Sequence, residues 1–136
     1  MKPEEILEMI SDQSEAPVLD IKVDGKRFVL GCLGKNGKMK SQDLADELKV
    51  STARIAVIIN TLEKDNLVIR EKDLIDKRIT YITLTDEGRT LTKNMYSKMI
   101  NTISSVMSRV GEEDLMTFIK VAKVIKEEVM KNESNI

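Results

Sequence analysis

The segment from Lys40 to Gly88 constrains the fold of this 136-residue chain more than any other part. Residues 41–48 form a short amphipathic pattern, a three-residue break follows, and a second helical pattern then begins. The second pattern places four large aliphatic side chains on one face: Ile55, Ile58, Ile59 and Leu62. Two strand-like runs, 67–72 and 79–84, come next, with a charged tip between them. This order predicts a winged helix-turn-helix, a shape that lays its second helix in the major groove of DNA.

Several residues indicate where these elements begin and end. Ser41 and Ser51 carry the hydroxyl that accepts a hydrogen bond at a helix N-cap. Asn66 suits the left-handed conformation that stops a helix, and the run Gly-Lys-Asn-Gly over 34–37 predicts a turn. Thr85, followed by two acidic residues, predicts the start of a further helix.

The flanking regions are also predicted to be helical. Short helices are expected over 3–12 and 26–33, whereas residues 14–24 stay open between extended and helical forms because Pro17 interrupts them. Towards the other end, a helix over 86–110 would be too long, at about 1.5 Å per residue, to be buried in one small domain.

Gly111 ends that helix, a last helix follows it, and the tail from Lys131 is expected to fray. The predicted fold class is mainly α with a small β-wing. A winged helix-turn-helix lobe over 35–85 lies between an N-terminal helical segment, 1–34, and C-terminal helices, 86–136, which together form a dimerisation region.

Composition excludes several classes of function. The chain has no His and a single Cys, and it has no Gly-rich phosphate loop, so the common catalytic and metal-binding sets are missing. We therefore expect no enzyme activity, no cofactor and no metal. The absence of a disulfide pair predicts a reducing, cytoplasmic setting, and no apolar run approaches the roughly 20 residues of a membrane span. Cys32 lies in the apolar run 28–33, which favours a buried, inert thiol over a redox switch.

The charge distribution gives only a weak indication of nucleic-acid binding. The net charge is −1, and residues 35–85 hold 10 basic and 8 acidic side chains. DNA affinity would therefore depend on where the charges lie rather than on their total.

The outer face of the second helix carries the candidate base contacts. Ala53 and Val57 could lie against thymine methyl groups, Asn60 could pair with an adenine edge, and Arg54 could bind guanine or phosphate. Two plainer interpretations are a helix packed on both sides and a tolerant surface. The predicted DNA-binding residues are Lys40, Ser51, Thr52, Ala53, Arg54, Ala56, Val57, Asn60, Thr61, Arg70, Lys72, Lys77 and Arg78.

The hairpin tip is the second candidate DNA contact. Basic residues at the end of a two-stranded wing can reach the minor groove, where the negative potential is strong. Asp73 and Asp76 would be repelled by phosphate, so we expect them to position the wing by holding Arg or Lys side chains. A mixed-charge, solvated hairpin is the plainer alternative.

Residues from about Phe28 to Leu91 resemble the MarR family of winged-helix transcriptional regulators. The resemblance lies in the Leu44-Ala45-x-x-Leu48 segment, in Asp73-x-x-Asp76-Lys77-Arg78 at the wing, and in Leu84-Thr85-Asp86-Glu87-Gly88. It implies a homodimer that reads a near-palindromic site in double-stranded DNA, commonly as a repressor released by a small lipophilic or phenolic effector. It also implies that Arg78 reaches the DNA and that Asp76 helps to fix the wing.

The resemblance further implies that the terminal helices intertwine in the dimer. The predicted dimerisation residues are Ile6, Leu7, Ile10, Ile103, Val106, Leu115, Phe118, Ile119 and Ala122. Val57 and Glu71 depart from the family pattern by lowering the positive charge. A winged-helix protein-interaction module without DNA binding is therefore the alternative, because the apolar surface at Ala56 and Val57 would also suit a protein partner.

Overall fold

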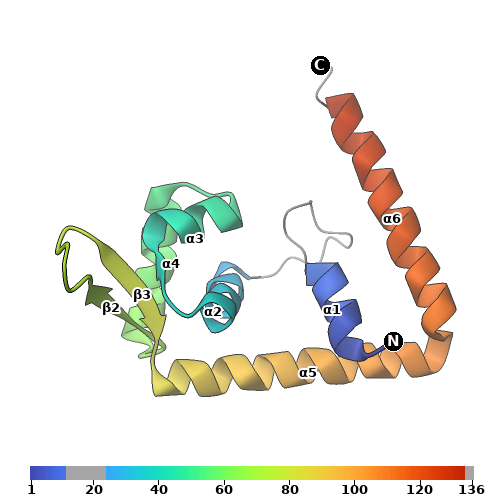
Figure 1. The fold of residues 1–136 in the computed structure, drawn as a ribbon, viewed down its shortest axis with the longest axis horizontal. Helices are drawn as coiled ribbons and strands as arrows, with labels where there is room; N and C mark the ends of the chain where they lie inside the picture. Colours follow the sequence, from blue (N-terminus) through green and yellow to red (C-terminus); the bar gives the residue numbers. More distant parts are fainter. Residues whose placement is uncertain (12–23, 134–136) are drawn as a thin grey trace. The chain divides into compact units, whose positions relative to one another are not determined.

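The computed structural model describes residues 1–11 and 24–133 (Figure 1). Its elements are α1 (Pro3–Ser11), α2 (Gly25–Asn36), β1 (Met39–Lys40), α3 (Ser41–Leu48), α4 (Thr52–Lys64), β2 (Val68–Lys72), β3 (Thr80–Leu84), α5 (Asp86–Val110) and α6 (Glu112–Glu133). The predicted fold class, mainly α with a small β-wing, is confirmed. Pro17 and the ambiguous stretch around it lie outside the described residues up to position 23.

The chain divides into two compact units. One unit, here called the lobe, is Val23–Met95, and the other, the terminal unit, combines the N-terminal end with the chain from Tyr96 onwards. The lobe is thus larger than the predicted 35–85. It gains α2 because Val29, Leu30 and Leu33 are buried in its core, and it gains the start of α5 because Met95 packs against that core.

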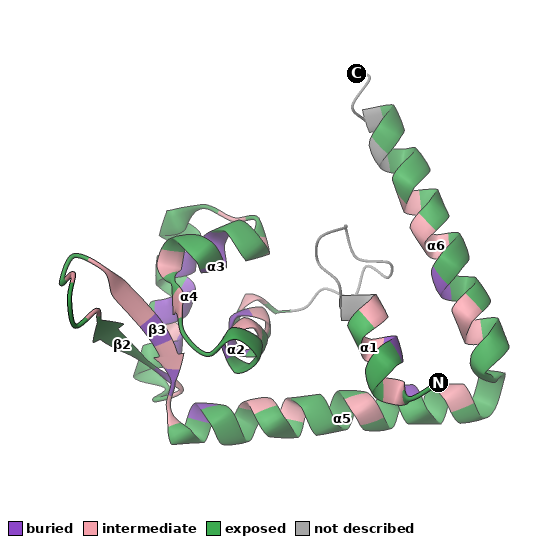
Figure 2. Ribbon diagram, in the orientation of Figure 1, coloured by how far each residue is buried: buried purple, intermediate pink, exposed green. Residues whose placement is uncertain are grey.

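The lobe is held together by an aliphatic core shared by its helices and its sheet (Figure 2). The predicted apolar face of α4 is confirmed, since Ile55, Ile58, Ile59 and Leu62 are all buried. Helices α2, α3 and α4 contact one another, and α4 also contacts β2. Burial of each such side chain stabilises the fold by about 1.5–3 kcal/mol, so the core outweighs any surface contact.

The wing belongs to a three-stranded antiparallel sheet in the order β1-β3-β2. Val68 pairs with Leu84 and Lys72 with Thr80, which gives the predicted hairpin. The third strand, β1, was not predicted. It has only two residues, and Met39 pairs with Ile82; such a short strand has no alternation that a sequence pattern could detect.

The predicted helix ends are partly right. Ser51 caps α4, with its Oγ accepting a hydrogen bond from the Arg54 N–H at 3.1 Å, and Asn66 adopts a left-handed φ of 60°. Ser41 was wrongly predicted as a cap: it is the first residue of α3, and the N-cap position belongs to extended Lys40, which makes no side-chain cap bond. The predicted turn over 34–37 was also wrong at its start, because α2 continues to Asn36 before Gly37 turns at a φ of 84°.

The start and end of α5 agree with the sequence. The Thr85 hydroxyl accepts a hydrogen bond from the Gly88 N–H at 3.0 Å and so caps the first turn. The helix ends at Val110, and Gly111 follows with a φ of 79°. The last helix, however, runs to Glu133, two residues past the point where fraying was predicted.

The terminal unit has its own small core, made by Ile6 of α1, Ile103 of α5 and Ile119 of α6. These three side chains were predicted to contact a partner chain. In the single chain all three are already buried in this core.

The remaining predicted dimerisation residues differ in exposure. Leu7 and Leu115 are half-buried against the terminal core, and Ala122 is also half-buried. Val106 and Phe118 are exposed. The side chain of Ile10 lies outside the described part of the chain. Throughout the described ranges, 1–11 and 24–133, none of the helices combines the length and the apolar character that crossing a membrane would require.

Candidate nucleic-acid interface

The outer face of α4 is free of packing within the lobe. Its residues Ala53, Arg54, Ala56, Val57 and Asn60 are exposed, and Val57 keeps 62% of its surface accessible. The interpretation of a helix packed on both sides is therefore wrong for the lobe itself. A small, nearly neutral face of this kind allows the helix backbone to approach a groove closely.

The two ends of this face differ in their free polar groups. At the N-terminus the Ser51 oxygen is used for capping, so the free N–H groups of the first turn, rather than the serine, carry the positive end of the helix dipole. Further along, Thr61 is half-buried and its hydroxyl donates to the Val57 carbonyl oxygen at 3.0 Å. Thr61 is thus engaged within its own helix. Lys40 and Thr52, also predicted as contacts, are exposed.

Arg70 of β2 bridges the wing to α4, a role that the sequence analysis missed. Its Nη2 donates a hydrogen bond to Asn60 Oδ1 at 2.7 Å, and its Nε lies 3.3 Å from Glu63 Oε2. Asn60 was predicted to pair with an adenine edge, but its amide oxygen already accepts this bond. The sequence gives no signal for the contact, because Arg70 lies on β2 while Asn60 and Glu63 lie on α4, and only folding brings the strand to the helix.

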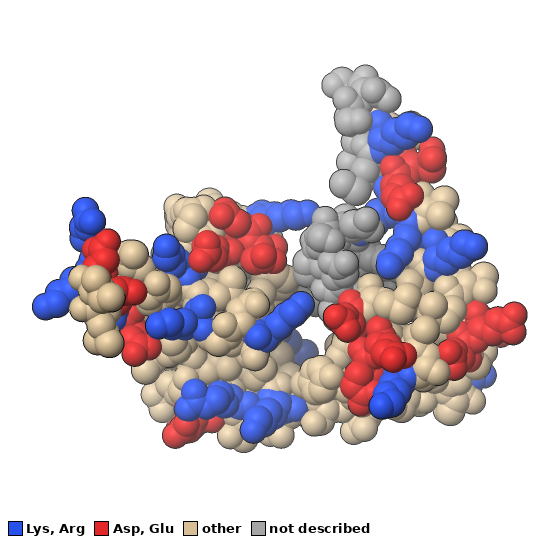
Figure 3. Space-filling model, in the orientation of Figure 1, with Lys and Arg blue, Asp and Glu red and all other residues tan. Residues whose placement is uncertain are grey.

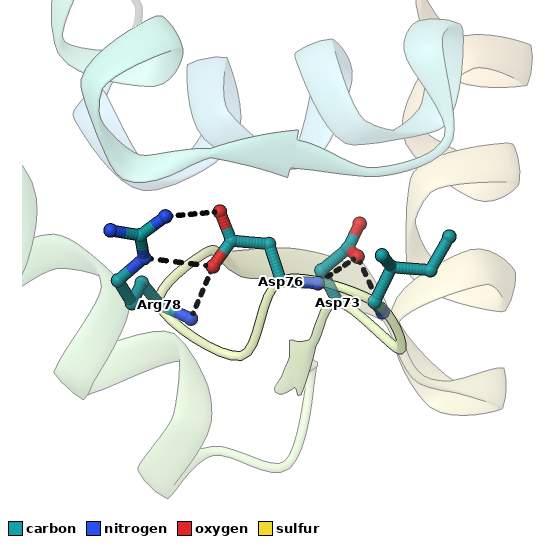
Figure 4. A network of polar contacts seen from close by, with 4 residues as sticks. Asp73, Asp76 and Arg78 are labelled. Atoms are coloured by element: carbon teal, nitrogen blue, oxygen red, sulfur yellow. Dashed lines mark hydrogen bonds and ion pairs between the residues drawn. The ribbon is translucent and has the colours of Figure 1, made fainter.

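The wing tip is organised by the carboxylate of Asp73. Its Oδ1 accepts hydrogen bonds from the N–H groups of Ile75 and Asp76, both at 2.9 Å (Figure 4). These bonds lower the pKa of Asp73. Asp73 therefore bonds to the backbone of the turn, whereas the sequence analysis expected it to hold an Arg or Lys side chain.

Asp76 holds the guanidinium of Arg78. Its two carboxylate oxygens accept from Arg78 Nε at 3.0 Å and from Nη2 at 3.2 Å, and Oδ1 also accepts from the Arg78 backbone N–H at 3.1 Å (Figure 4). The predicted contact between Asp76 and a basic wing residue is confirmed. Arg78 keeps 91% of its side-chain surface exposed, so it is oriented by the wing and still open to an anion.

This pairing predicts how the wing responds to acid. The Arg78 hydrogen bonds lower the pKa of Asp76 below its ordinary 3.8. A carboxyl group whose pKa is depressed on folding contributes stability above its unfolded pKa and loses it as the pH falls through the folded value. The pairing should therefore be unchanged from pH 7 down to the ordinary carboxyl pKa and break only below it.

Carbon-detected NMR of the Asp76 carboxyl group measures that titration. The Arg78→Ala variant is the matched control, and in it the Asp76 pKa should return towards 3.8. A midpoint at or above 3.8 in the wild-type protein would contradict the pairing.

Cys32 is half-buried against the lobe core, as expected for an inert thiol. Burial, with a smaller contribution from the negative charge of Glu47, raises the pKa of the Cys32 thiol to about 11. The reactive thiolate is therefore scarce at neutral pH. Over the described residues, no group of three or more Cys, Asp or Glu side chains lies close enough to hold a metal ion.

We expect iodoacetamide at pH 8 to alkylate Cys32 at least about 10-fold more slowly in the native protein than in the urea-unfolded chain, because folding removes thiolate. Mass spectrometry of quenched samples measures both rates on the same thiol. Equal rates would show that folding does not protect Cys32 and would reopen the redox interpretation.

Comparisons with known proteins find a matching family model, similar transcriptional regulators and similar solved structures. The sequence model of the MarR family matches residues 26–80. The HTH-type transcriptional repressor MdtR of Bacillus subtilis is 26% identical over 112 residues, which are 82% of this chain and 68% of MdtR. The structure of Streptococcus pneumoniae FabT in complex with DNA matches with a TM-score of 0.70 at 16% identity, covering 94% of this chain and 86% of FabT.

A second solved structure, that of NadR in complex with 4-hydroxyphenylacetate, matches with a TM-score of 0.59 at 20% identity. It covers 90% of this chain and 82% of NadR. At these identities the two structures establish the fold of this chain, while the assignment of individual contacts depends on its own residues.

Proposed function

We propose that the chain, whose residues 26–80 match the MarR family model, is a homodimeric repressor of transcription that belongs to this family of winged-helix regulators and binds a near-palindromic site in double-stranded DNA. Regulators of this kind bind nucleic acid and catalyse no reaction, so no enzyme activity is proposed. The protein acts in the cytoplasm, where it has access to the DNA.

The observation that carries this proposal is the exposed face of α4 beside an ordered wing. Ala53, Ala56 and Val57 form an apolar strip without bulk, which suits contact with thymine methyl groups. Arg54 lies exposed at the N-terminal end of the same helix, where it can contact phosphate or guanine. Arg78 reaches the DNA from the wing.

The bond from Arg70 to Asn60 refines the proposed base contacts. Since Asn60 Oδ1 accepts from Arg70 at 2.7 Å, its amide nitrogen is the group left for a base. The nitrogen donates, so Asn60 contacts an acceptor such as N7 of a purine or O4 of thymine. Arg70 itself positions Asn60 and contributes less to the DNA than the sequence suggested.

The dimer is proposed to form through the terminal unit. Helix α6 leaves a row of apolar side chains exposed in the single chain: Phe118, Val121, Val124, Ile125 and Val129. Val106 and Val110 of α5 are exposed as well. Large exposed apolar surfaces of this kind indicate a protein interface, and a second copy of the chain fits the two-fold symmetry of a palindromic site.

Release by a small lipophilic or phenolic molecule is proposed from family membership and from the NadR complex with 4-hydroxyphenylacetate. Such an effector can lower DNA affinity only if it binds better to a form of the dimer that does not fit the DNA. The proposal therefore requires the effector and the DNA to weaken each other's binding by the same factor.

Selection of bound duplexes from a random pool, at about 100 mM salt, tests the proposal. A palindromic motif with half-sites about one helical turn apart is the expected result, and sedimentation of the protein should show a dimer. Enrichment of no sequence by a protein shown to be folded and dimeric would overturn the proposal. The protein-interaction alternative, which rests on the apolar Ala56 and Val57 surface, would then be favoured.

A further inference from the structure

The wing ends in two exposed aliphatic side chains that the proposed function leaves unexplained. Leu74 is 94% exposed and Ile75 is 95% exposed, more than any other large hydrophobic residue in the described part of the chain. Single exposed aliphatic residues are common on protein surfaces. Leu74 and Ile75, here called the apolar tip, are neighbours at the end of a projecting hairpin. Together they form a contiguous apolar patch whose exposure to water is unfavourable.

The turn beneath the apolar tip holds it in one conformation. Asp73 accepts hydrogen bonds from the backbone N–H of Ile75 and of the next residue, and its own N–H donates to the Ile79 carbonyl oxygen at 2.9 Å. The Ile79 N–H donates in return to the Asp76 carbonyl oxygen at 3.0 Å. A preorganised pair of side chains loses less conformational freedom on binding than a mobile loop would.

The basic residues beside the apolar tip suit a polyanion, and exposed Glu71 of β2 is the acidic residue next to them. Lys72, Lys77 and Arg78 are exposed beside the apolar tip, and Figure 3 shows Lys and Arg side chains at the end of the wing, on the left, with Asp and Glu side chains among them. The two acidic residues of the tip are engaged within the wing, Asp73 with backbone N–H groups and Asp76 with Arg78. An apolar tip between cations matches the minor groove of DNA, where sugar and base surfaces lie between two rows of phosphates.

We propose that Leu74 and Ile75 enter the minor groove beside the major-groove segment read by α4 and pack against its sugars and base edges. Apolar side chains inserted into the minor groove are a recurrent mode of DNA binding. The contact supplies a part of the affinity that does not depend on salt, which suits a chain with a net charge of only −1. This inference rests on the proposed function. It adds that the contact of Leu74 and Ile75 with the minor groove is apolar.

The test compares the wild-type dimer with the double variant Leu74→Ser/Ile75→Ser on the duplex selected by the wild-type protein. The replaced side chains are almost fully exposed, so the thermal midpoint should not change. We expect the Kd to rise about 10-fold or more, because apolar contact is lost. The slope of log Kd against log salt should stay the same, because no phosphate contact is removed.

Two matched variants separate the apolar contact from the ionic one. Leu74→Met/Ile75→Met keeps apolar side chains and should retain wild-type affinity. Lys77→Ala removes a charge and should lower the salt slope by about one. Hydroxyl-radical cleavage, which reports on exposed deoxyriboses, should show minor-groove protection flanking the α4 site with the wild-type and Met proteins but not with the Ser variant.

Wild-type affinity and footprint in the Ser variant would overturn the inference and leave the proposed function standing. Loss of the dimer in that variant, seen by sedimentation, would also overturn it, since the apolar tip would then contact protein. Failure of the wild-type protein to select any duplex would overturn the proposed function first and this inference with it.

Discussion

Replacing Gly88 with alanine is expected to destabilise the lobe by about 3 kcal/mol or more, the upper end of what overpacking costs. A Cβ atom at this position would lie 2.1 Å from the carbonyl oxygen of Leu67. The obstacle is backbone, so it cannot rotate away as a flexible side chain would. That oxygen also accepts the hydrogen bond from the Thr85 N–H at 3.0 Å, so moving it disturbs the start of α5 as well.

Thermal unfolding followed by circular dichroism measures the effect, with an expected fall in the midpoint of roughly 10 °C. Gly31→Ala is the matched control. Gly31 lies within α2, and a Cβ there meets no atom within 4 Å. Because alanine is the better helix former, this variant should be stabilised by about 0.5–1 kcal/mol. Equal thermal midpoints for the two variants would show that the backbone at Leu67 and the start of α5 can move apart without loss of stability.

Replacing Val57 with glutamate is expected to weaken DNA binding at least about 100-fold. Val57 is 62% exposed on the outer face of α4, so in the proposed complex the new carboxylate would face the DNA and would also attract Arg54, one turn earlier, away from its DNA contact. Like charges brought together in an interface cost several kcal/mol. Stability should change by no more than about 0.5 kcal/mol, as for other surface substitutions. Fluorescence anisotropy with the selected duplex measures the affinity.

Val57→Thr is the control for that variant, because threonine has nearly the same shape and no charge. It should retain affinity within about 10-fold. If the glutamate variant binds the duplex as tightly as the wild-type protein, α4 does not lie in the groove. The apolar surface at Ala56 and Val57 would then be free for a protein partner.

The sequence predicted the elements of the lobe well because its signals are local and strong. The apolar face of α4 repeats with the helical period, and the hairpin alternates with the strand period, so both were placed within about one residue. Ser51 and Thr85 act as caps by accepting hydrogen bonds from the N–H groups of Arg54 and Gly88. The Thr85 hydroxyl also donates to the Asn66 carbonyl oxygen at 2.7 Å, which ties the cap to the end of the preceding helix. Ser41 failed as a cap because it is already the first residue of α3. The N-cap position falls on Lys40, which β1 holds extended through its pairing with Tyr81.

The contacts within the candidate interface were predicted less well, because they depend on which elements meet in space. The bridge from Arg70 to Asn60 joins a strand to a helix ten residues earlier. Nothing in either segment alone indicates it. The same limit applies to Ile6, Ile103 and Ile119, which were predicted to lie in a dimer interface. Their spacing indicates an apolar face, but it does not tell whether a partner chain or the same chain covers that face.

The shared core of the lobe also determines which molecule must adapt when the protein binds DNA. The core joins α4 to Val68 of β2 and to Ile82 and Leu84 of β3, so the helix and the wing form one stiff body. Changing the distance between them would break close packing. A duplex whose major and minor grooves do not match that fixed spacing has to bend or narrow instead. Base pairs that the protein never touches can then decide affinity through the cost of deforming them.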